Sequence, residues 1–280
     1  VLIGSVNHLG FAGSRVAISL RALNLGADQI AIGTMIALYA LCPMLLSIVI
    51  GKFADRTSPR LPMMIGMGGM GIALLLPALF PGIIVLYVSS FLLGLCNQVC
   101  NIPMEAVIGG IGGVDKRASN YSMMGMGFSF ATFLGPLTAG VSIDHIGYVQ
   151  VFPILAAFCL PPLVMLWFMP SLLPKAGKHA AQAKRGSVLD LWRIPHLRVT
   201  FIAGGIVASA WDLFQFYLPI YGHSVGLSAS AIGTIIGTVA VAMFVIRGAI
   251  PFLVKKLTEA EIMTYAIFVS AFAFVLLPFF

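Results

Sequence analysis

Two ionisable residues interrupt long apolar stretches of this sequence, where a charge is least expected. Arg15 lies in the segment GFAGSRVAIS, and Asp212 lies in the segment ASAWDLFQFYLP. A charge deep in a hydrocarbon layer costs about 2.5–3.5 kcal/mol on insertion scales, and such residues usually pair, bind a ligand or carry a proton. If both segments cross a membrane, the two side chains can bind opposite ends of a polar solute, or Asp212 can take up and release a proton. A static ion pair that only stabilises the protein is the alternative.

Further polar side chains occur in the same segments and in one other apolar segment, and they can line the same cavity. They are amides and one imidazole: Asn7, His8, Asn97, Gln98, Asn101 and Gln215. Trp211, beside Asp212, can form an apolar wall for a ligand in that cavity. Each of them can equally form a hydrogen bond or a packing contact between helices. Glu105, Asp144 and Arg247 lie near the ends of apolar segments, where side chains can reach water, so we expect no special role for them.

The composition places these segments in a membrane. Of the 280 residues 60% are hydrophobic and only 9% are charged, whereas soluble domains average roughly 45–50% apolar and about 25% charged residues. Apolar stretches of about 20 residues recur, and each is long enough to cross a hydrocarbon core of ~30 Å as a helix. The sequence therefore predicts an all-α membrane protein with several spans, in contact with the lipid bilayer.

No constellation of residues indicates an enzyme, a metal site or a cofactor. The cysteines Cys42, Cys96, Cys100 and Cys159 lie within apolar segments and have no histidine or carboxylate nearby in the sequence, as expected of small core residues. The acidic residues are scattered over different segments, whereas a membrane-embedded enzyme needs a metal cluster or a paired nucleophile and base. We predict neither activity nor cofactor of that kind.

Nine spans can be delimited, and the charges between them set their orientation. The spans are residues 2–23, 30–50, 61–80, 83–108, 120–142, 150–170, 200–221, 229–251 and 262–280. Every second connection is basic, and all of the 16 Lys and Arg residues except Arg15, Arg21 and Arg247 lie on that one side. The positive-inside rule makes this side and the N-terminus cytoplasmic. The net charge of +7 is thus a signal of topology, and we expect no nucleic-acid partner.

The longest polar stretch, PKAGKHAAQAKRGS at 174–187, divides six spans from three. Its Ala, Lys and Gly content predicts a flexible cytoplasmic linker. The following VLDLWRIPHLR, residues 188–198, mixes apolar and charged residues, which suits either a short helix in the membrane interface or a plain linker.

The segments on the two sides of this linker repeat each other at an offset of 200 residues. LGADQIAIGTMIALYA before and within the second span matches VGLSASAIGTIIGTVA at the eighth, with Gly26 over Gly226 and AIGT at 31–34 over AIGT at 231–234. Parallel repeats of six spans joined by a cytoplasmic linker predict two six-helix bundles. The expected parts are an N-terminal bundle at 1–173, a linker at 174–198, and the first three spans of a second bundle at 199–280, truncated after the ninth span.

The basic connection GKFADRTSPR, residues 51–60, resembles the signature between spans 2 and 3 of the major facilitator superfamily. Gly51, Ala54, Asp55 and Arg56 match it, Arg60 replaces another base, and Phe53, Ser58 and Pro59 depart from it. In that family the acidic and basic residues form a conformational latch between the two halves on the cytoplasmic side. The resemblance therefore implies such a latch at Gly51, Asp55, Arg56 and Arg60; an orientation signal alone would explain the bases but not Asp55.

A second stretch, ATFLGPLTAG at 131–140, resembles the span 5 signature of exporters in the same family. Gly135, Pro136 and Gly140 match, while Ala131 and Ala139 replace glycines. Independently of the family, small residues permit close helix packing and a proline bends the span, so tight packing without a mechanistic role is the alternative. A departure is Ser90, four residues before Gly94, where drug exporters often carry an arginine linked to proton coupling.

The resemblance implies a secondary transporter of the bacterial drug or metabolite exporter branch. It would move a small organic compound by alternating access, with proton-coupled export as the first expectation, and would act as a monomer in the bacterial inner membrane. An importer or facilitator of an organic anion, which Arg15 would suit, is the alternative. A membrane sensor with a transporter fold is the alternative outside transport.

Overall fold

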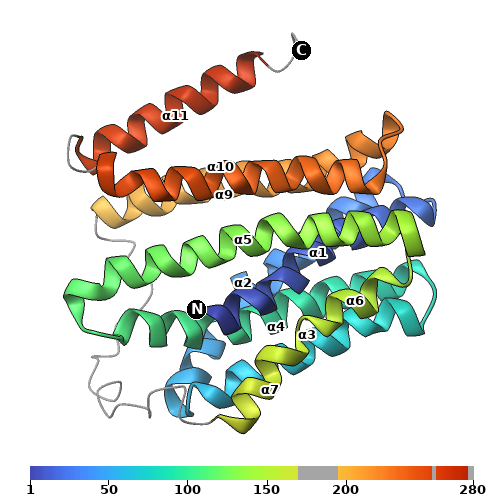
Figure 1. The fold of residues 1–280 in the computed structure, drawn as a ribbon, viewed down its shortest axis with the longest axis horizontal. Coiled ribbons are helices and arrows are strands. Elements are labelled where there is room, and N and C mark those ends of the chain that lie inside the picture. The colour runs from blue at the N-terminus through green and yellow to red at the C-terminus, as the bar shows by residue number, and fades with distance from the viewer. Residues whose placement is uncertain (170–194, 254–256, 277–280) are drawn as a thin grey trace.

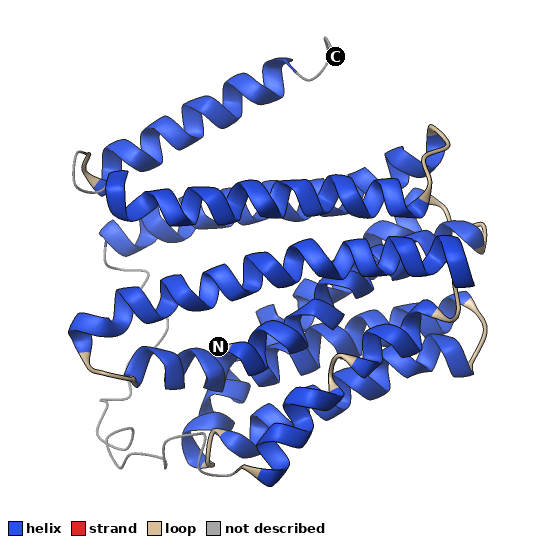
Figure 2. Cartoon of the chain, viewed as in Figure 1, coloured by secondary structure: helices blue, strands red, loops and turns tan. Residues whose placement is uncertain are grey.

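A computed structural model describes residues 1–169, 195–253 and 257–276 of the chain (Figure 1). Within these ranges every regular element is an α-helix (Figure 2). The helices are α1 (Leu2–Asn24), α2 (Gln29–Arg56), α3 (Arg60–Leu79), α4 (Ile83–Gly110), α5 (Val114–Ile146), α6 (Val151–Ala157), α7 (Leu160–Phe168), α9 (Pro195–Ser224), α10 (Ala229–Leu253) and α11 (Glu259–Leu276). The prediction of an all-α protein is confirmed.

The helices coincide with the nine predicted spans, with one correction. The predicted span 150–170 is broken into α6 and α7 at Phe158 and Cys159. Pro161 and Pro162 follow this break directly. Each proline lacks a backbone N–H group, so neither can donate a hydrogen bond that would continue α6. Both fit the first turn of α7, where the N–H groups have no partner within the helix.

Seven stretches of the described residues are long and apolar enough to cross a membrane, with α6 and α7 counted together as one. The helices α1 and α11 are not among the seven. In α1 the side chains Asn7, His8 and Arg15 interrupt the apolar surface, yet most of this helix is buried by its neighbours. In α11 the described residues end at Leu276.

The repeat at an offset of 200 residues is visible in the backbone. The helices α2 and α10 begin at Gln29 and Ala229, and the turns before them contain Gly26 at φ 79° and Gly226 at φ 78°. The Asp28 carboxylate accepts a hydrogen bond from the Ala31 amide at 2.8 Å. At the equivalent place the Ser228 hydroxyl accepts one from the Ala231 amide at 3.1 Å. Two equal turns, each with its N-cap, support a duplicated unit.

Close helix packing holds α1 to α7 together. Gly66 of α3 packs against the backbone of Cys96 and Cys100 in α4, and Gly94 of α4 packs against the backbone of Tyr39 in α2. No side chain fits between the paired backbones at these positions. Since lipid tails are as apolar as the side chains, such van der Waals contact is what favours association of helices in a bilayer. Most residues of α1 are buried, since this helix lies among the other helices of the bundle (Figure 1).

The helices that follow the linker meet this bundle mainly through α10. It runs beside α5 along much of its length, while α9 lies against α10 and also contacts α1 and α2 (Figure 1). The bounds of α9 correct one detail, because residues 195–198, assigned to the linker from the sequence, are helical and belong to α9. The remainder of the predicted linker and interfacial helix, 174–194, lies outside the described residues.

Candidate functional site

The two charges within the apolar segments form an ion pair. The Arg15 Nη1 atom of α1 lies 2.7 Å from the Asp212 Oδ1 atom of α9 and donates a hydrogen bond to it. The Arg15 side chain is 15% exposed and that of Asp212 is 42% exposed. The pair thus joins the two halves of the repeat, with the cation deeper in the bundle and the carboxylate more accessible.

Aromatic rings hold the Arg15 guanidinium in place. Its central carbon lies 5.6 Å from the centre of the Phe11 ring and 5.4 Å from that of the Tyr39 ring. Phe11 is one helical turn before Arg15, and Tyr39 comes from α2. Cation–π contacts stabilise by about 0.5–2 kcal/mol, with the larger values in dry sites. The rings therefore orient the guanidinium without neutralising it, which leaves it able to bind an anion.

Hydrogen bonds fix the Tyr39 ring in turn. Its hydroxyl is 2.9 Å from the Ser14 hydroxyl, which also donates to the Phe11 carbonyl at 2.7 Å. Both Ser14 and Tyr39 are buried. Sequence reasoning missed Phe11, Ser14 and Tyr39, because an aromatic ring and a serine are common in apolar spans. The spacing of Phe11 and Arg15 by one turn was the available signal for the first.

The remaining predicted cavity residues do not contact the ion pair through hydrogen bonds among the described residues. Trp211 and Phe214 have ring centres 5.9 Å apart beside Asp212, and Gln215 is buried one turn after Trp211. Asn97 is buried, and its amide oxygen has no hydrogen-bond partner among the described residues. Gln98 and Asn101 are half-buried on α4. Within the described part of the chain, none of them forms a hydrogen bond with Arg15 or Asp212, so their cavity role stays a prediction.

The neighbours Asn7 and His8 point to different helices. The Asn7 amide nitrogen lies 3.9 Å from both the Met70 and the Cys100 sulfur atoms, which belong to α3 and α4. The His8 ring stacks on Phe128 of α5 at 4.4 Å between centres, and it lies 5.7 Å from Phe11. His8, Phe11 and Arg15 consequently follow one another along one side of α1, with Asn7 turned away from it.

The span 5 signature gives α5 two packing faces. Gly135 meets the backbone of Leu9 and Gly13 in α1, so it serves the first bundle. Gly140 meets the backbone of Ala229 in α10, and the Pro136 carbonyl lies against Gly233. The signature therefore lies at the contact between the halves of the repeat, and both contacts require the absence of a side chain.

Two charged residues to which the sequence assigned no role connect α5 with α10, and that expectation was wrong. The Asp144 carboxylate accepts hydrogen bonds from the Ala229 amide at 3.1 Å and the Ser230 amide at 2.8 Å. Near the other end of the same helix pair, the Arg247 guanidinium donates to the Gly125 carbonyl and the Ser129 hydroxyl. These contacts could not be predicted from the sequence, because they depend on which helices pack together.

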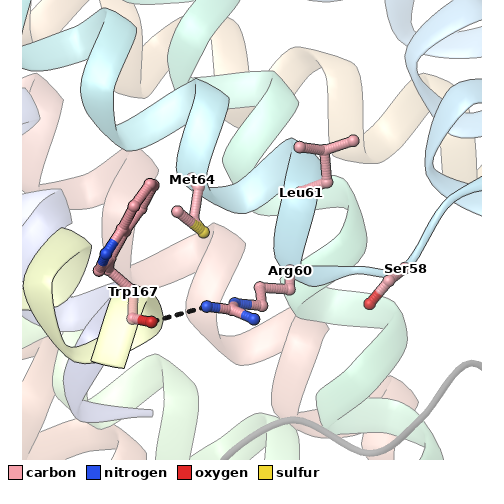
Figure 3. Close-up of a pocket in the computed structure, with 5 residues that line it drawn as sticks. All are labelled: Ser58, Arg60, Leu61, Met64 and Trp167. Atoms are coloured by element: carbon pink, nitrogen blue, oxygen red, sulfur yellow. Dashed lines mark hydrogen bonds between the residues drawn. The ribbon is translucent and has the colours of Figure 1, made fainter. Parts of the chain in front are cut away.

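The predicted latch at 51–60 is not assembled between the halves in this structure. Asp55 and Arg56 are exposed at the end of α2, and their side chains form no hydrogen bond or ion pair within the described ranges. Gly51 has open space around it. Arg60 instead reaches α7 of the same bundle, where it donates to the Leu166 carbonyl at 2.8 Å. It also donates to the Trp167 carbonyl at 2.7 Å (Figure 3). The latch stays a prediction.

Comparisons with known proteins agree with this architecture. Two solved structures of a bacterial homologue of the human lysosomal transporter Spinster, both inward-facing, resemble the chain. The unoccupied form has a TM-score of 0.65 at 17% identity, covering 85% of this chain and 57% of the other. The occupied form has a TM-score of 0.67 at 19% identity, covering 92% and 60%. The chain thus spans less than two thirds of these relatives, and at such identities the likeness concerns the fold.

The sequence itself identifies the family. A search of curated proteins finds no match, but residues 1–280 match the profile described as Major Facilitator Superfamily. This is a family of membrane transporters, which confirms the expectation that the chain is not an enzyme. With an all-helical fold, a duplicated unit and a match over its whole length, the chain belongs to the major facilitator superfamily.

Proposed function

We propose that the protein is a secondary transporter that moves a small organic compound by alternating access, with Arg15 and Asp212 at its binding site. The observation that supports this most strongly is their ion pair, which joins α1 and α9 with 2.7 Å between Nη1 and Oδ1. A pair between two halves that must move relative to each other has to form or break in the transport cycle. The exposure of Asp212, at 42%, permits a solute or water to reach it.

The pair offers a simple means of coupling. A solute with an anionic group competes with Asp212 for the guanidinium, and a cationic solute competes with Arg15 for the carboxylate. A proton on Asp212 removes the charge that holds Arg15, so proton binding releases the pair and leaves Arg15 to an anion or a dipole. Protons and solute then bind at one place in alternation, as exchange across a membrane requires. The aromatic contacts of Phe11 and Tyr39 keep Arg15 oriented meanwhile.

Export is the direction that we favour, because Gly135, Pro136 and Gly140 resemble the span 5 signature of exporters. Ser90, at the place of the arginine that exporters often carry, argues for proton coupling through Asp212 instead of that route. The second candidate is import or facilitated passage of an organic anion. The deep, oriented and aromatic-lined cation at Arg15 favours it.

The setting that we propose is the bacterial inner membrane, with the protein as a monomer and its N-terminus cytoplasmic. The basic connections after α2, α4 and α10 support this orientation by the positive-inside rule. The turns that contain Gly26 and Gly226 lie on the opposite face of the membrane in this orientation.

Proton flux tests the proposal. The protein is reconstituted in vesicles with a pH-sensitive dye, a pH gradient is imposed, and pools of organic cations, anions and neutral compounds are added. We expect solute-dependent proton movement that Asp212→Asn abolishes and that Arg15→Gln abolishes or restricts to other solutes. Intact transport in both variants would refute the site. Uptake of labelled solute without a gradient, unaffected by Asp212→Asn, would favour the facilitator.

A further inference from the structure

Two pockets lie along one groove on the outer side of the first bundle, between α3 and the broken pair α6 and α7. The first has a volume of about 400 Å³ and is lined by Ser58, Arg60, Leu61, Met64 and Trp167 (Figure 3). The second has a volume of about 380 Å³ and an apolar lining that includes Gly68, Gly71, Leu75, Ala157 and Leu163. Met64 and Gly68 are one turn apart on α3, and so are Leu163 and Trp167 on α7. The two pockets are therefore neighbours along α3 and α7, and we infer that they form one groove.

The ends of this groove differ in chemistry. Its polar end contains the Arg60 guanidinium and the Ser58 hydroxyl, with the Trp167 ring on the opposite wall (Figure 3). Tryptophan is enriched where the hydrocarbon meets the headgroups of a bilayer. The remainder of the groove is apolar, and residues along it such as Leu61, Ile72 and Leu160 are 48%, 63% and 58% exposed. This side of the bundle therefore faces lipid.

The Arg60 cation lacks a carboxylate partner within the described part of the chain. Its Nε and Nη2 atoms donate to the last carbonyls of α7, which orients the guanidinium and uses two of its five N–H groups. The Nη1 atom has no hydrogen bond there. Arg60 is also the first residue of α3, where the helix dipole favours an anion. Both features call for a negative charge in the first pocket.

The space in the second pocket comes from small residues and from the break between α6 and α7. A Cβ atom built on Gly68 would be 3.9 Å from the nearest atom, and one on Gly71 would be 3.7 Å from it. A methyl group at either glycine would therefore be in ordinary van der Waals contact without a clash, and its absence adds to the space of the pocket. Arg60 and Gly71 are eleven residues apart, or ~16 Å along a helix. That is about half of a ~30 Å hydrocarbon core, the depth of one leaflet.

We propose that this groove binds one anionic phospholipid, with its phosphate at Arg60 and Ser58 and one acyl chain along Gly68 and Gly71. The site lies at the basic face of the protein, on the lipid-facing side of α3, and is separate from the Arg15–Asp212 pair. A bound lipid connects the end of the 51–60 segment to α7. It needs neither the transported solute nor the coupling ion, so the proposal stands apart from the proposed function.

Lipid binding to the purified protein in mild detergent tests the site. Native mass spectrometry measures the affinity for phosphatidylglycerol and for phosphatidylcholine. Arg60→Gln should weaken phosphatidylglycerol binding about tenfold, because a charge-assisted hydrogen bond is lost. Arg56→Gln is the matched control, since Arg56 is an exposed base of the same segment without a partner among the described residues. Equal losses in the two variants would overturn the proposal.

A second pair of variants separates the groove from the charge. Gly68→Leu fills the apolar part with Arg60 intact and should weaken binding several-fold. Gly204→Leu should not, because a Cβ atom at this place on α9 meets no described atom within 4 Å. Unchanged binding in Gly68→Leu would refute the acyl-chain groove. Competition by soluble glycerol phosphate as effective as by the lipid would assign the pocket to a free phosphate and refute the lipid. Arg60→Gln could instead leave the lipid affinity unchanged and lower the melting temperature equally with and without lipid. Arg60 would then only stabilise the end of α7, and the proposal would be refuted.

Discussion

Asp144 at the end of α5 accepts a hydrogen bond, at 3.1 Å, from the backbone amide of Ala229, the first residue of α10. The second carboxylate oxygen binds the amide of Ser230 at 2.8 Å. A carboxylate at a helix N-terminus satisfies donors that the helix leaves open and interacts favourably with its dipole. Here the helix belongs to the other half of the repeat. The contact thus closes one end of the interface between the halves.

Removing this charge should loosen that end. We expect Asp144→Asn to weaken the contact by about 0.5–2 kcal/mol, the range of helix capping and dipole effects. Spin labels at the exposed Ile146 and Val225, on the same face, measure the result as a broader and longer distance distribution. Asp28→Asn is the control, because Asp28 caps its own helix α2. An unchanged distribution in Asp144→Asn would mean that glycine packing alone closes this end.

At the other end of the same helix pair, Arg247→Gln should weaken the contact between α5 and α10 to a similar extent. The guanidinium donates to the Gly125 carbonyl and the Ser129 hydroxyl, and hydrogen bonds to charged groups contribute about 1.5–3 kcal/mol. Labels at the exposed Met123 and Val245 should move apart. Arg247→Lys keeps the charge but not the fork of donors, so partial recovery is expected. If the Arg247 side chain were only solvated, both variants would give the same label distances as the original protein.

Gly233→Ala tests the close approach of α5 and α10. A Cβ atom there would overlap the Pro136 carbonyl, which is backbone and cannot move aside easily. We expect a loss of about 1–3 kcal/mol in stability, typical of overpacking, seen as a lower melting temperature in detergent. Gly204→Ala is the matched control, because a Cβ atom on Gly204 would meet no atom of the described residues within 4 Å. Alanine favours the helix there by up to about 1 kcal/mol. Equal melting temperatures for the two variants would contradict the packing.

Tyr39 allows the aromatic and polar parts of the site to be separated. Tyr39→Phe removes the hydrogen bond to Ser14 but keeps the ring beside Arg15, so we expect a loss of about 0.5–1.5 kcal/mol in stability and near-normal solute affinity. Tyr39→Leu also removes the cation–π contact and should weaken solute binding further. Solute-dependent quenching of the tryptophan fluorescence, to which Trp211 beside Asp212 contributes, measures the affinity. Identical affinities in both variants would show that the ring does not orient Arg15.

Much of the fold could be predicted from the sequence because the bilayer restricts the choices. Long apolar runs must be helices there, and their ends follow from Gly, Pro and charged residues. The starts of α2 and α10 at equivalent positions were visible in the AIGT repeat. The break at Phe158 was missed, although Pro161 and Pro162 were in view, because one proline in a span usually bends it while two in succession interrupt it.

The site was predictable only in part. A charge in an apolar run is conspicuous, so Arg15 and Asp212 could be picked out. The offset of 200 makes Arg15 the counterpart of residue 215, which is less than one helical turn from Asp212 and thus at a similar depth. Asp144 and Arg247 lie at helix ends, where their types are ordinary. Their roles depend on the backbone atoms of Ala229 and Gly125 in another helix, and backbone groups leave no signal in the residue types. Phe11 and Tyr39 were hidden among the many aromatic residues of the spans.

The equal turns at Gly26 and Gly226 have a consequence for the charges. A duplicated half that returns at the same membrane face gives every position of α1 a counterpart in α9. Arg15 corresponds to Gln215, and Asp212 corresponds to Ala12. A mirrored protein, with Ala12→Asp and Gln215→Arg in place of the original charges, would carry its acid in the first half and its base in the second on the same scaffold. The duplicated scaffold thus offers equivalent positions for the cation in both halves, and this sequence has it in the first.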